Sequence, residues 1–130
     1  MRCTNVCLSI LLAVAAIAGC ASDMQVSTIQ VGRSLNADNT VANHTTVFKP
    51  QGTVYVSVLT SGSGSGTITV RWIYEGTAVG EQKKAVAYRG NAATEFHLQN
   101  AGGFPPGEYT AEVLFDGKPA GAKKFRVEKN

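Results

Sequence analysis

Few side chains in this sequence could carry out acid–base or metal chemistry, and those few are far apart. His44 lies in a polar stretch, and His97 alternates with Glu95 on the outer face of an expected strand. A zinc site requires three or four ligands, which two histidines without a neighbouring cysteine do not supply. Glu108 and Glu112 share one exposed strand face about 13 Å apart, and this separation is too long for an acid–base pair. The sequence therefore predicts a non-enzymatic protein without catalytic residues and without a metal site.

Nucleotide and nucleic-acid binding are also disfavoured. The run Ser61–Gly66 places glycine at every second position, as some phosphate-binding loops do, but it lacks the lysine and the following helix that such a loop requires. We interpret this run as a flexible loop that joins two strands. Twelve lysines and arginines against nine acidic residues give a formal net charge of +3, far from the dense basic surface of a nucleic-acid binder. We expect no nucleic-acid partner and no noncovalent cofactor.

The clearest chemical signal lies at the N-terminus. Arg2 precedes an apolar run over residues 6–17, and polar sequence begins at Ser22. A basic start, a short apolar core and small residues before a cleavage point are the parts of a secretory signal. A permanent membrane span needs roughly 20 apolar residues, so this run predicts a signal that is removed.

The end of this run, Ile17-Ala18-Gly19-Cys20, resembles the lipobox of bacterial lipoproteins. The resemblance implies cleavage between Gly19 and Cys20, a diacylglycerol on the Cys20 thiol and an acyl chain such as palmitate on the new amino group. Several acyl chains anchor a protein firmly, whereas one gives only marginal binding. In this family an aspartate after the cysteine favours the inner membrane; Ala21 stands there, so the resemblance favours the outer membrane. The alternative is an ordinary signal peptide that ends near a cysteine.

The chain therefore divides into a signal peptide over residues 1–19, a lipidated tether over residues 20–25 and one domain over residues 26–130. Cys3 and Cys7 lie in the part that is removed, so the mature chain keeps Cys20 alone and has no intramolecular disulfide. A domain of this size has room for a single hydrophobic core.

Apolar and polar residues alternate along much of the domain, as they do in strands with one buried face. In the segment over residues 67–74, Ile68, Val70 and Trp72 face one side and Arg71 faces the other. Such alternation is typical of an antiparallel sheet with one buried face. Similar patterns predict strands over residues 53–58, 94–98, 109–115 and 125–127, with weaker strands over 25–32, 45–48 and 83–88. About seven short strands predict an all-β, two-layer antiparallel sandwich, with a tight type I′ turn at Asp116-Gly117.

Two motifs resemble the immunoglobulin-like fold. Trp72 matches the core tryptophan of an early strand, and the segment 107–111 matches the strand whose tyrosine forms the tyrosine corner. Ala111 stands where antibody domains have a cysteine, so the resemblance is to disulfide-free immunoglobulin-like or fibronectin-III-like domains. The stretch from Phe48 to Val127 is also similar to small domains of bacterial envelope lipoproteins. The resemblance concerns the architecture of roughly two thirds of the chain.

Two features define a candidate binding surface. Phe104 lies in a Gly/Pro-rich loop, where an aromatic ring either contacts a ligand or folds back over the end of the sandwich. Lys83, Lys84, Arg89 and Arg71 form a basic group that could meet anionic lipid headgroups or acidic glycans. The alternative for this group is an edge strand protected by its lysines from pairing with other chains.

These observations predict a lipid-anchored, periplasm-facing protein of the bacterial envelope that serves as a binding or accessory module of an envelope protein complex. The alternative is a carbohydrate-binding module that contacts peptidoglycan or surface polysaccharide. Such a module needs exposed aromatic platforms, for which Tyr55, Tyr88 and Phe104 are the candidates. The expected partners are the membrane, through the lipid anchor, and an envelope protein.

Overall fold

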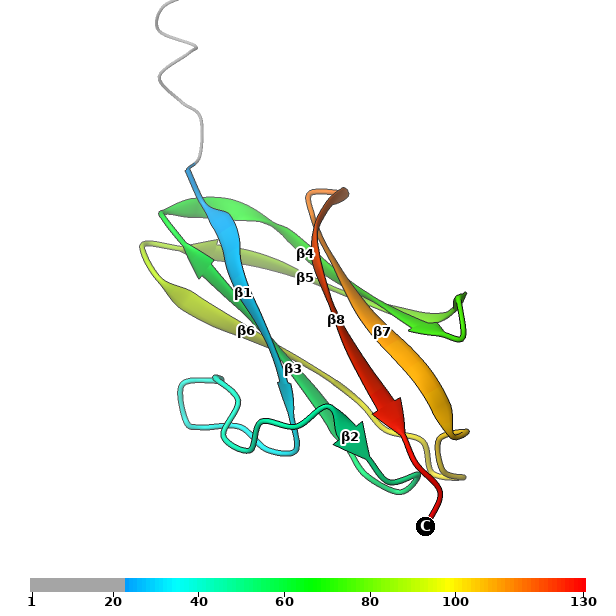
Figure 1. The fold of residues 1–130 in the computed structure, drawn as a ribbon. Coiled ribbons are helices and arrows are strands. Elements are labelled where there is room, and N and C mark those ends of the chain that lie inside the picture. The colour runs from blue at the N-terminus through cyan, green and yellow to red at the C-terminus, as the bar shows by residue number, and fades with distance from the viewer. Residues whose placement is uncertain (1–22) are drawn as a thin grey trace, which may run out of the picture.

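The computed structural model describes residues 23–130, so the predicted signal peptide, its cleavage point and Cys20 lie outside the described residues. The described chain forms eight strands and no helix (Figure 1). Their bounds are β1 Gln25–Gly32, β2 Val47–Phe48, β3 Val54–Ser61, β4 Gly64–Tyr74, β5 Thr77–Tyr88, β6 Ala92–Leu98, β7 Gly107–Phe115 and β8 Lys118–Val127. No helix that could cross a membrane occurs in this part of the chain.

The strands form two facing sheets, which confirms the predicted sandwich. One sheet has three strands in the order β1-β3-β6, and the other has five in the order β2-β8-β7-β4-β5. One detail differs from the predicted antiparallel arrangement: β2 pairs with β8 in parallel. The segment between β1 and β2 carries the chain from one sheet to the other. The short parallel contact between β2 and β8 brings the buried ring of Phe48 against that of Phe125, with the two ring centroids 5.6 Å apart.

The core lies between the sheets and contains the predicted inward-facing residues of β4. Ile68 and Val70 have no exposed surface and Trp72 is 1% exposed, whereas the side chain of Arg71 is 39% exposed. Trp72 packs edge-to-face on Phe125. The predicted alternation in this strand is therefore confirmed.

Two hairpins use the same kind of turn. Asp116 and Gly117 have φ values of 51° and 80°, as a type I′ turn requires of both central residues. Asp116 also fixes the turn, because its Oδ1 accepts a hydrogen bond from the Thr67 backbone N–H at 2.8 Å. The β4–β5 turn repeats this pattern at Glu75 and Gly76, with φ values of 49° and 86°, and this second turn was not anticipated.

The Ser/Gly run over residues 61–66 is not the predicted loop. Ser61 ends β3 and Gly64 begins β4, so only Gly62 and Ser63 join the two strands. Gly62 has a φ of 80° and lies against the backbone of Asp23, which leaves no room for a side chain. These tertiary contacts favour strand over the flexibility that the composition suggested. Likewise, β5 extends well before the predicted start at residue 83, because it pairs with the whole length of β4.

The domain begins earlier than the sequence indicated. Met24 is 5% exposed, and Gln25 already belongs to β1. Asp23 Oδ1 accepts a hydrogen bond from the Ser63 backbone N–H at 3.0 Å. The segment predicted as a tether, residues 20–25, thus overlaps the folded domain at its last three residues.

Candidate functional site

The outer face of the five-stranded sheet carries two of the predicted basic residues, and acidic neighbours offset their charge. Arg71 on β4 forms an ion pair with Glu112 on β7 at 3.0 Å and a longer one with Glu81 on β5 at 3.7 Å. Lys83 also pairs with Glu81, at 3.5 Å. This face therefore presents an interleaved set of charges and not a basic patch.

Lys84 points to a different side of the molecule. Its Nζ donates a hydrogen bond to the backbone carbonyl of Glu95 on β6, lies 3.2 Å from the Glu95 carboxylate and 5.0 Å from the centre of the Phe96 ring. Arg89 is exposed in the turn between β5 and β6. The structure thus brings Arg71 and Lys83 together through Glu81 and leaves the other predicted cations apart from them.

The Glu95 side chain on β6 contacts His97 on the same strand and Lys84 on β5, and so links the two strands. Its carboxylate accepts a short hydrogen bond from His97 Nδ1 and contacts Lys84 Nζ. Burial opposes ionisation of this carboxyl, but the hydrogen bonds and positive charges of His97 and Lys84 outweigh that effect, so the pKa of Glu95 is lowered. Across residues 23–130, no group of three or more His, Cys, Asp or Glu side chains could hold a metal ion.

Phe104 lies inside the molecule, 6% exposed, where it covers one end of the sandwich. Its ring packs edge-to-face on Tyr109, with centroids 6.1 Å apart. The Tyr109 hydroxyl donates to the Pro105 carbonyl oxygen at 2.7 Å, which is the tyrosine corner implied by the fold resemblance. Beside it, the Tyr74 hydroxyl donates to the Pro106 carbonyl oxygen at 2.9 Å. Phe104 therefore does not share a surface with the basic residues.

Burial raises the pKa of Tyr109 to about 12, and the nearby Tyr74 and Glu75 add to the effect. The hydroxyl of Tyr109 is thus held in its neutral, hydrogen-bond-donating form. This fixes the loop between β6 and β7 to the start of β7, and a fixed loop is a suitable wall for a binding site.

The loop between β6 and β7 borders a groove of about 280 Å³ at this end of the sandwich. The residues that line it are mostly apolar: Trp72, Tyr74, Val79, Leu98, Phe104 and Pro105. Val79 is 57% exposed and projects from the edge strand β5. The sequence analysis recognised Phe104 in this region but did not predict the groove, since its other walls come from four separate strands, β4, β5, β6 and β7.

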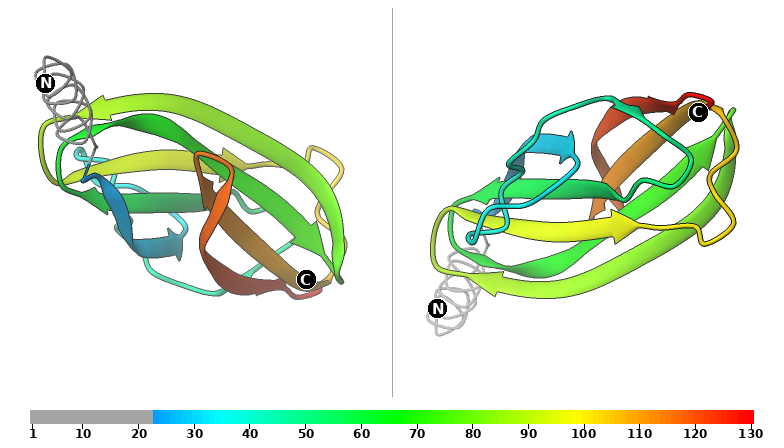
Figure 2. Two further views of the ribbon diagram at one scale, coloured as in Figure 1. Left: turned by 90° about the horizontal axis from the view of Figure 1, so that it is seen from above. Right: turned by 90° about the horizontal axis from the view of Figure 1, so that it is seen from below.

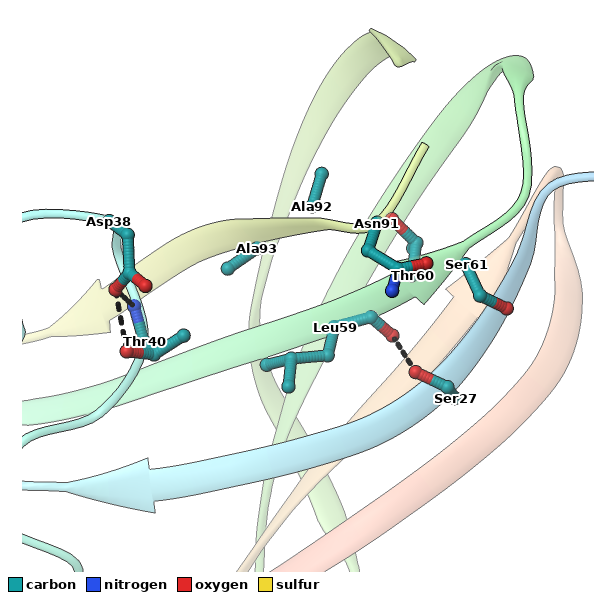
Figure 3. A pocket seen from close by; sticks show the side chains of 9 residues that line it. All are labelled: Ser27, Asp38, Thr40, Leu59, Thr60, Ser61, Asn91, Ala92 and Ala93. Carbon is teal, nitrogen blue, oxygen red and sulfur yellow. Dashed lines mark hydrogen bonds between the residues drawn. The ribbon is translucent and has the colours of Figure 1, made fainter. Parts of the chain in front are cut away.

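A second hollow, of about 520 Å³, lies over the three-stranded sheet (Figure 3). Small aliphatic residues form its floor, namely Leu59, Ala92 and Ala93, and hydroxyl, amide and carboxylate groups surround them, namely Ser27, Asp38, Thr40, Thr60, Ser61 and Asn91. Hydrogen bonds from the Thr40 side chain and backbone lower the pKa of Asp38. This hollow has polar groups for a hydrophilic ligand but no aromatic ring among its lining residues.

No protein-family model and no curated protein matches this sequence. Several solved structures share its fold. An immunoglobulin-like protein from Pseudomonas aeruginosa superposes with a TM-score of 0.57 at 13% identity, covering 84% of this chain and 99% of that one. An alkylpurine DNA glycosylase from Pseudomonas fluorescens, bound to DNA with an abasic site analogue, gives 0.55 at 13% identity, covering 83% of this chain and 31% of the glycosylase.

A mutant β-glucosidase from Listeria innocua, in complex with laminaribiose, gives a TM-score of 0.50 at 13% identity, and the match covers 82% of this chain but only 16% of the glucosidase. The matched region is thus a small part of both enzymes. At such low identity the similarity establishes the fold and does not transfer a function. Residues 23–130 form a β-sandwich domain of the immunoglobulin-like type.

Proposed function

We propose that this chain is a lipid-anchored, periplasm-facing lipoprotein of the bacterial envelope, held in the membrane by Cys20, and that it works as a non-enzymatic binding module for another envelope protein. The main support for the anchor is the lipobox-like segment Ile17-Ala18-Gly19-Cys20, and the junction that follows it determines how the anchored domain would be held. Asp23 and Met24 are already tied to the sandwich, so only Ala21 and Ser22 separate the domain from the cysteine.

This short junction limits how the domain can be presented. The three residue steps from Cys20 to Asp23 span at most about 11 Å when fully extended, so the end of the sandwich where β1 starts would lie close to the lipid surface. The β3–β4 and β5–β6 turns share that end, and the β4–β5 turn and the β6–β7 loop lie at the opposite end (Figure 2). In the proposed orientation, the groove beside Phe104 faces away from the membrane.

Glycan binding has less support than protein binding. Of the three aromatic residues that could form a sugar platform, Phe104 is buried, Tyr55 is half-buried with its ring 5.8 Å from that of His97, and Tyr88 is half-buried with its hydroxyl bonded to Thr94. A sugar-binding site needs an open ring face, and none of these side chains lies free on the surface.

The test is chemical crosslinking in intact cells, followed by extraction of the membranes and purification of the protein through an affinity tag at its C-terminus. We expect one envelope protein to be recovered in a fixed ratio to the bait, and the ratio to fall for the Cys20→Ser variant because that variant is not anchored. Retention on immobilised peptidoglycan, without a stoichiometric protein partner, would support the glycan-binding alternative instead.

A further inference from the structure

We propose that the groove between the ends of β5 and β6 binds a polypeptide segment of the envelope partner, in which one apolar side chain is flanked by lysine or arginine. This inference rests on the proposed function, since it states which chemical features the proposed envelope partner presents to the groove.

On the open side of the sandwich, the outermost strands β5 and β6 lie side by side without pairing to each other (Figure 2). Side chains from β5 bridge this gap at three positions. Tyr88 bonds to Thr94 at 2.7 Å, Lys84 to the Glu95 carbonyl, and Gln82 to the His97 carbonyl at 2.8 Å. The bridging residues share one strand face.

Gly80 is the next residue on that face, and it has no side chain to continue the series. It pairs with the inward-facing Trp72, as Gln82 pairs with the inward-facing Val70. An irregularity in the pairing at this point makes Val79 an additional residue in β5, and such bulges redirect side chains at sheet edges. The bridge is therefore missing where the groove opens over Trp72.

Trp72 leaves a hydrogen-bond donor unused beside this gap. Its indole Nε1 is buried and has no hydrogen-bond partner, although buried polar groups are normally paired. A methyl group on Gly80 would lie 3.7 Å from Cδ1, the ring atom bonded to Nε1, so the polar edge of the indole lies next to the vacant position. A polypeptide bound in the groove would lie over this edge of the ring, so the indole N–H resonance would report its arrival.

The remaining lining of the groove favours an apolar side chain. Val79, Leu98 and Pro105 provide aliphatic contacts. The hydroxyls of Tyr74 and Tyr109 are already bonded to backbone carbonyls, and the two rings pack on each other with centroids 4.7 Å apart. Neither hydroxyl is therefore free to bond to a sugar.

Charge beside the groove favours a basic flank. Glu75 directly follows Tyr74, which lines the groove, and is exposed. Its carboxylate accepts a hydrogen bond from the Glu108 backbone N–H at 2.6 Å, which holds this negative charge at the same end of the sandwich. The strand edges of β5 and β6 border the groove, and extended segments commonly bind along such edges. An extended segment with an apolar side chain between basic residues matches all three features.

The test uses the indole N–H of Trp72 as a reporter, because this is the only tryptophan in the sequence. The membrane-extracted, full-length mature protein is labelled with nitrogen-15 and titrated with the peptide acetyl-Lys-Thr-Leu-Thr-Lys-amide. We expect the indole N–H resonance to shift in a saturable manner, and the shift to be lost when alanine replaces the leucine or glutamate replaces both lysines.

Variants of the groove give the matched comparison. Gly80→Leu fills the vacant position without a close contact to the neighbouring side chains at Cβ, and we expect it to weaken peptide binding by about tenfold or more. Gly90→Leu, at the opposite end where a Cβ meets open space, should bind as the wild type does. Val79→Ser changes an exposed residue and should also weaken binding, which guards against a folding defect in the first variant.

An unshifted indole resonance in the folded wild-type protein at millimolar peptide would overturn the groove proposal, as would equal shifts with the alanine and leucine peptides. The mass of the same preparation reports acylation independently. An acylated protein without peptide binding contradicts the groove proposal alone, and peptide binding by an unacylated protein contradicts the anchor alone.

Discussion

The hydroxyl of Tyr109 donates a hydrogen bond to the carbonyl oxygen of Pro105, four residues earlier in the chain, at 2.7 Å. The same ring stacks on Phe125, with centroids 5.2 Å apart and an angle of 11° between planes. Tyr109 thus joins the core to the loop that forms one wall of the groove. The shape of the proposed binding site consequently depends on one buried tyrosine.

The Tyr109→Phe variant should keep the ring packing and lose the hydrogen bond. Loss of such a partly buried hydrogen bond costs about 0.5–1.5 kcal/mol, and we expect the free energy of unfolding in urea to fall by about that amount. Tyr74→Phe, which removes a more exposed hydrogen bond to Pro106, should cost less. Equal stabilities of Tyr109→Phe and wild type would show that the corner contributes nothing to folding.

Stability should decrease at alkaline pH because of the same residue. An unfolded tyrosine has a pKa of about 10, and the folded-state pKa of Tyr109 is raised to about 12. The stabilising contribution is fully present below the unfolded pKa and is lost as the pH rises through the folded pKa. Unfolding free energies measured across this range should decline for the wild type and decline less for Tyr109→Phe, and a parallel decline in both would argue against Tyr109 as the cause.

Acid should weaken the contact between β5 and β6. The folded-state pKa of Glu95 is lowered from the ordinary value of 4.5, so ionised Glu95 contributes stability above that pH, and the contribution is lost as the pH falls through the folded-state pKa. A Glu95→Gln variant should therefore be less stable than wild type at neutral pH and approach it in acid. A difference that is constant with pH would exclude ionisation of Glu95 as its origin.

Adjacent residues of β4 should respond very differently to truncation. Trp72→Ala removes a buried ring, and such changes cost about 3–5 kcal/mol. Arg71→Ala removes two partly exposed ion pairs, which contribute about 0–1 kcal/mol each. Thermal unfolding followed by circular dichroism compares the two, and similar losses for both variants would be inconsistent with the observed strand register.

Local patterns in the sequence predicted much of this fold. The alternation of Trp72 and Arg71 follows from the period of a strand, and the Asp116-Gly117 turn follows from backbone conformations that few residues adopt. Both signals are contained in a few neighbouring residues. For this reason the sandwich, the inward-facing residues of β4 and the type of that turn were predictable.

Features that depend on distant contacts were not predictable in this way. The Ser61–Gly66 run is strand except at Gly62 and Ser63. Asp23 packs against Gly62 in this short turn, and the Phe115 ring packs against Gly66 in β4. Gly80 leaves a gap beside the groove only because β5 faces β6 across the open side of the sandwich. Lys83 and Lys84 point to different sides of the molecule because alternate positions of β5 face opposite sides. The sequence supplied these residues as candidates, but the sheet topology determines which of them meet.

The most direct test of the central claim is the intact mass and the N-terminal residue of the protein extracted from cell membranes. The lipid-anchor proposal predicts a chain that begins at Cys20, carries a diacylglycerol and a further acyl chain, and is recovered from the membrane fraction. The Cys20→Ser variant should keep residues 1–19 and gain no acyl mass. Recovery of the wild-type protein as a soluble, unmodified periplasmic chain would contradict the proposed function.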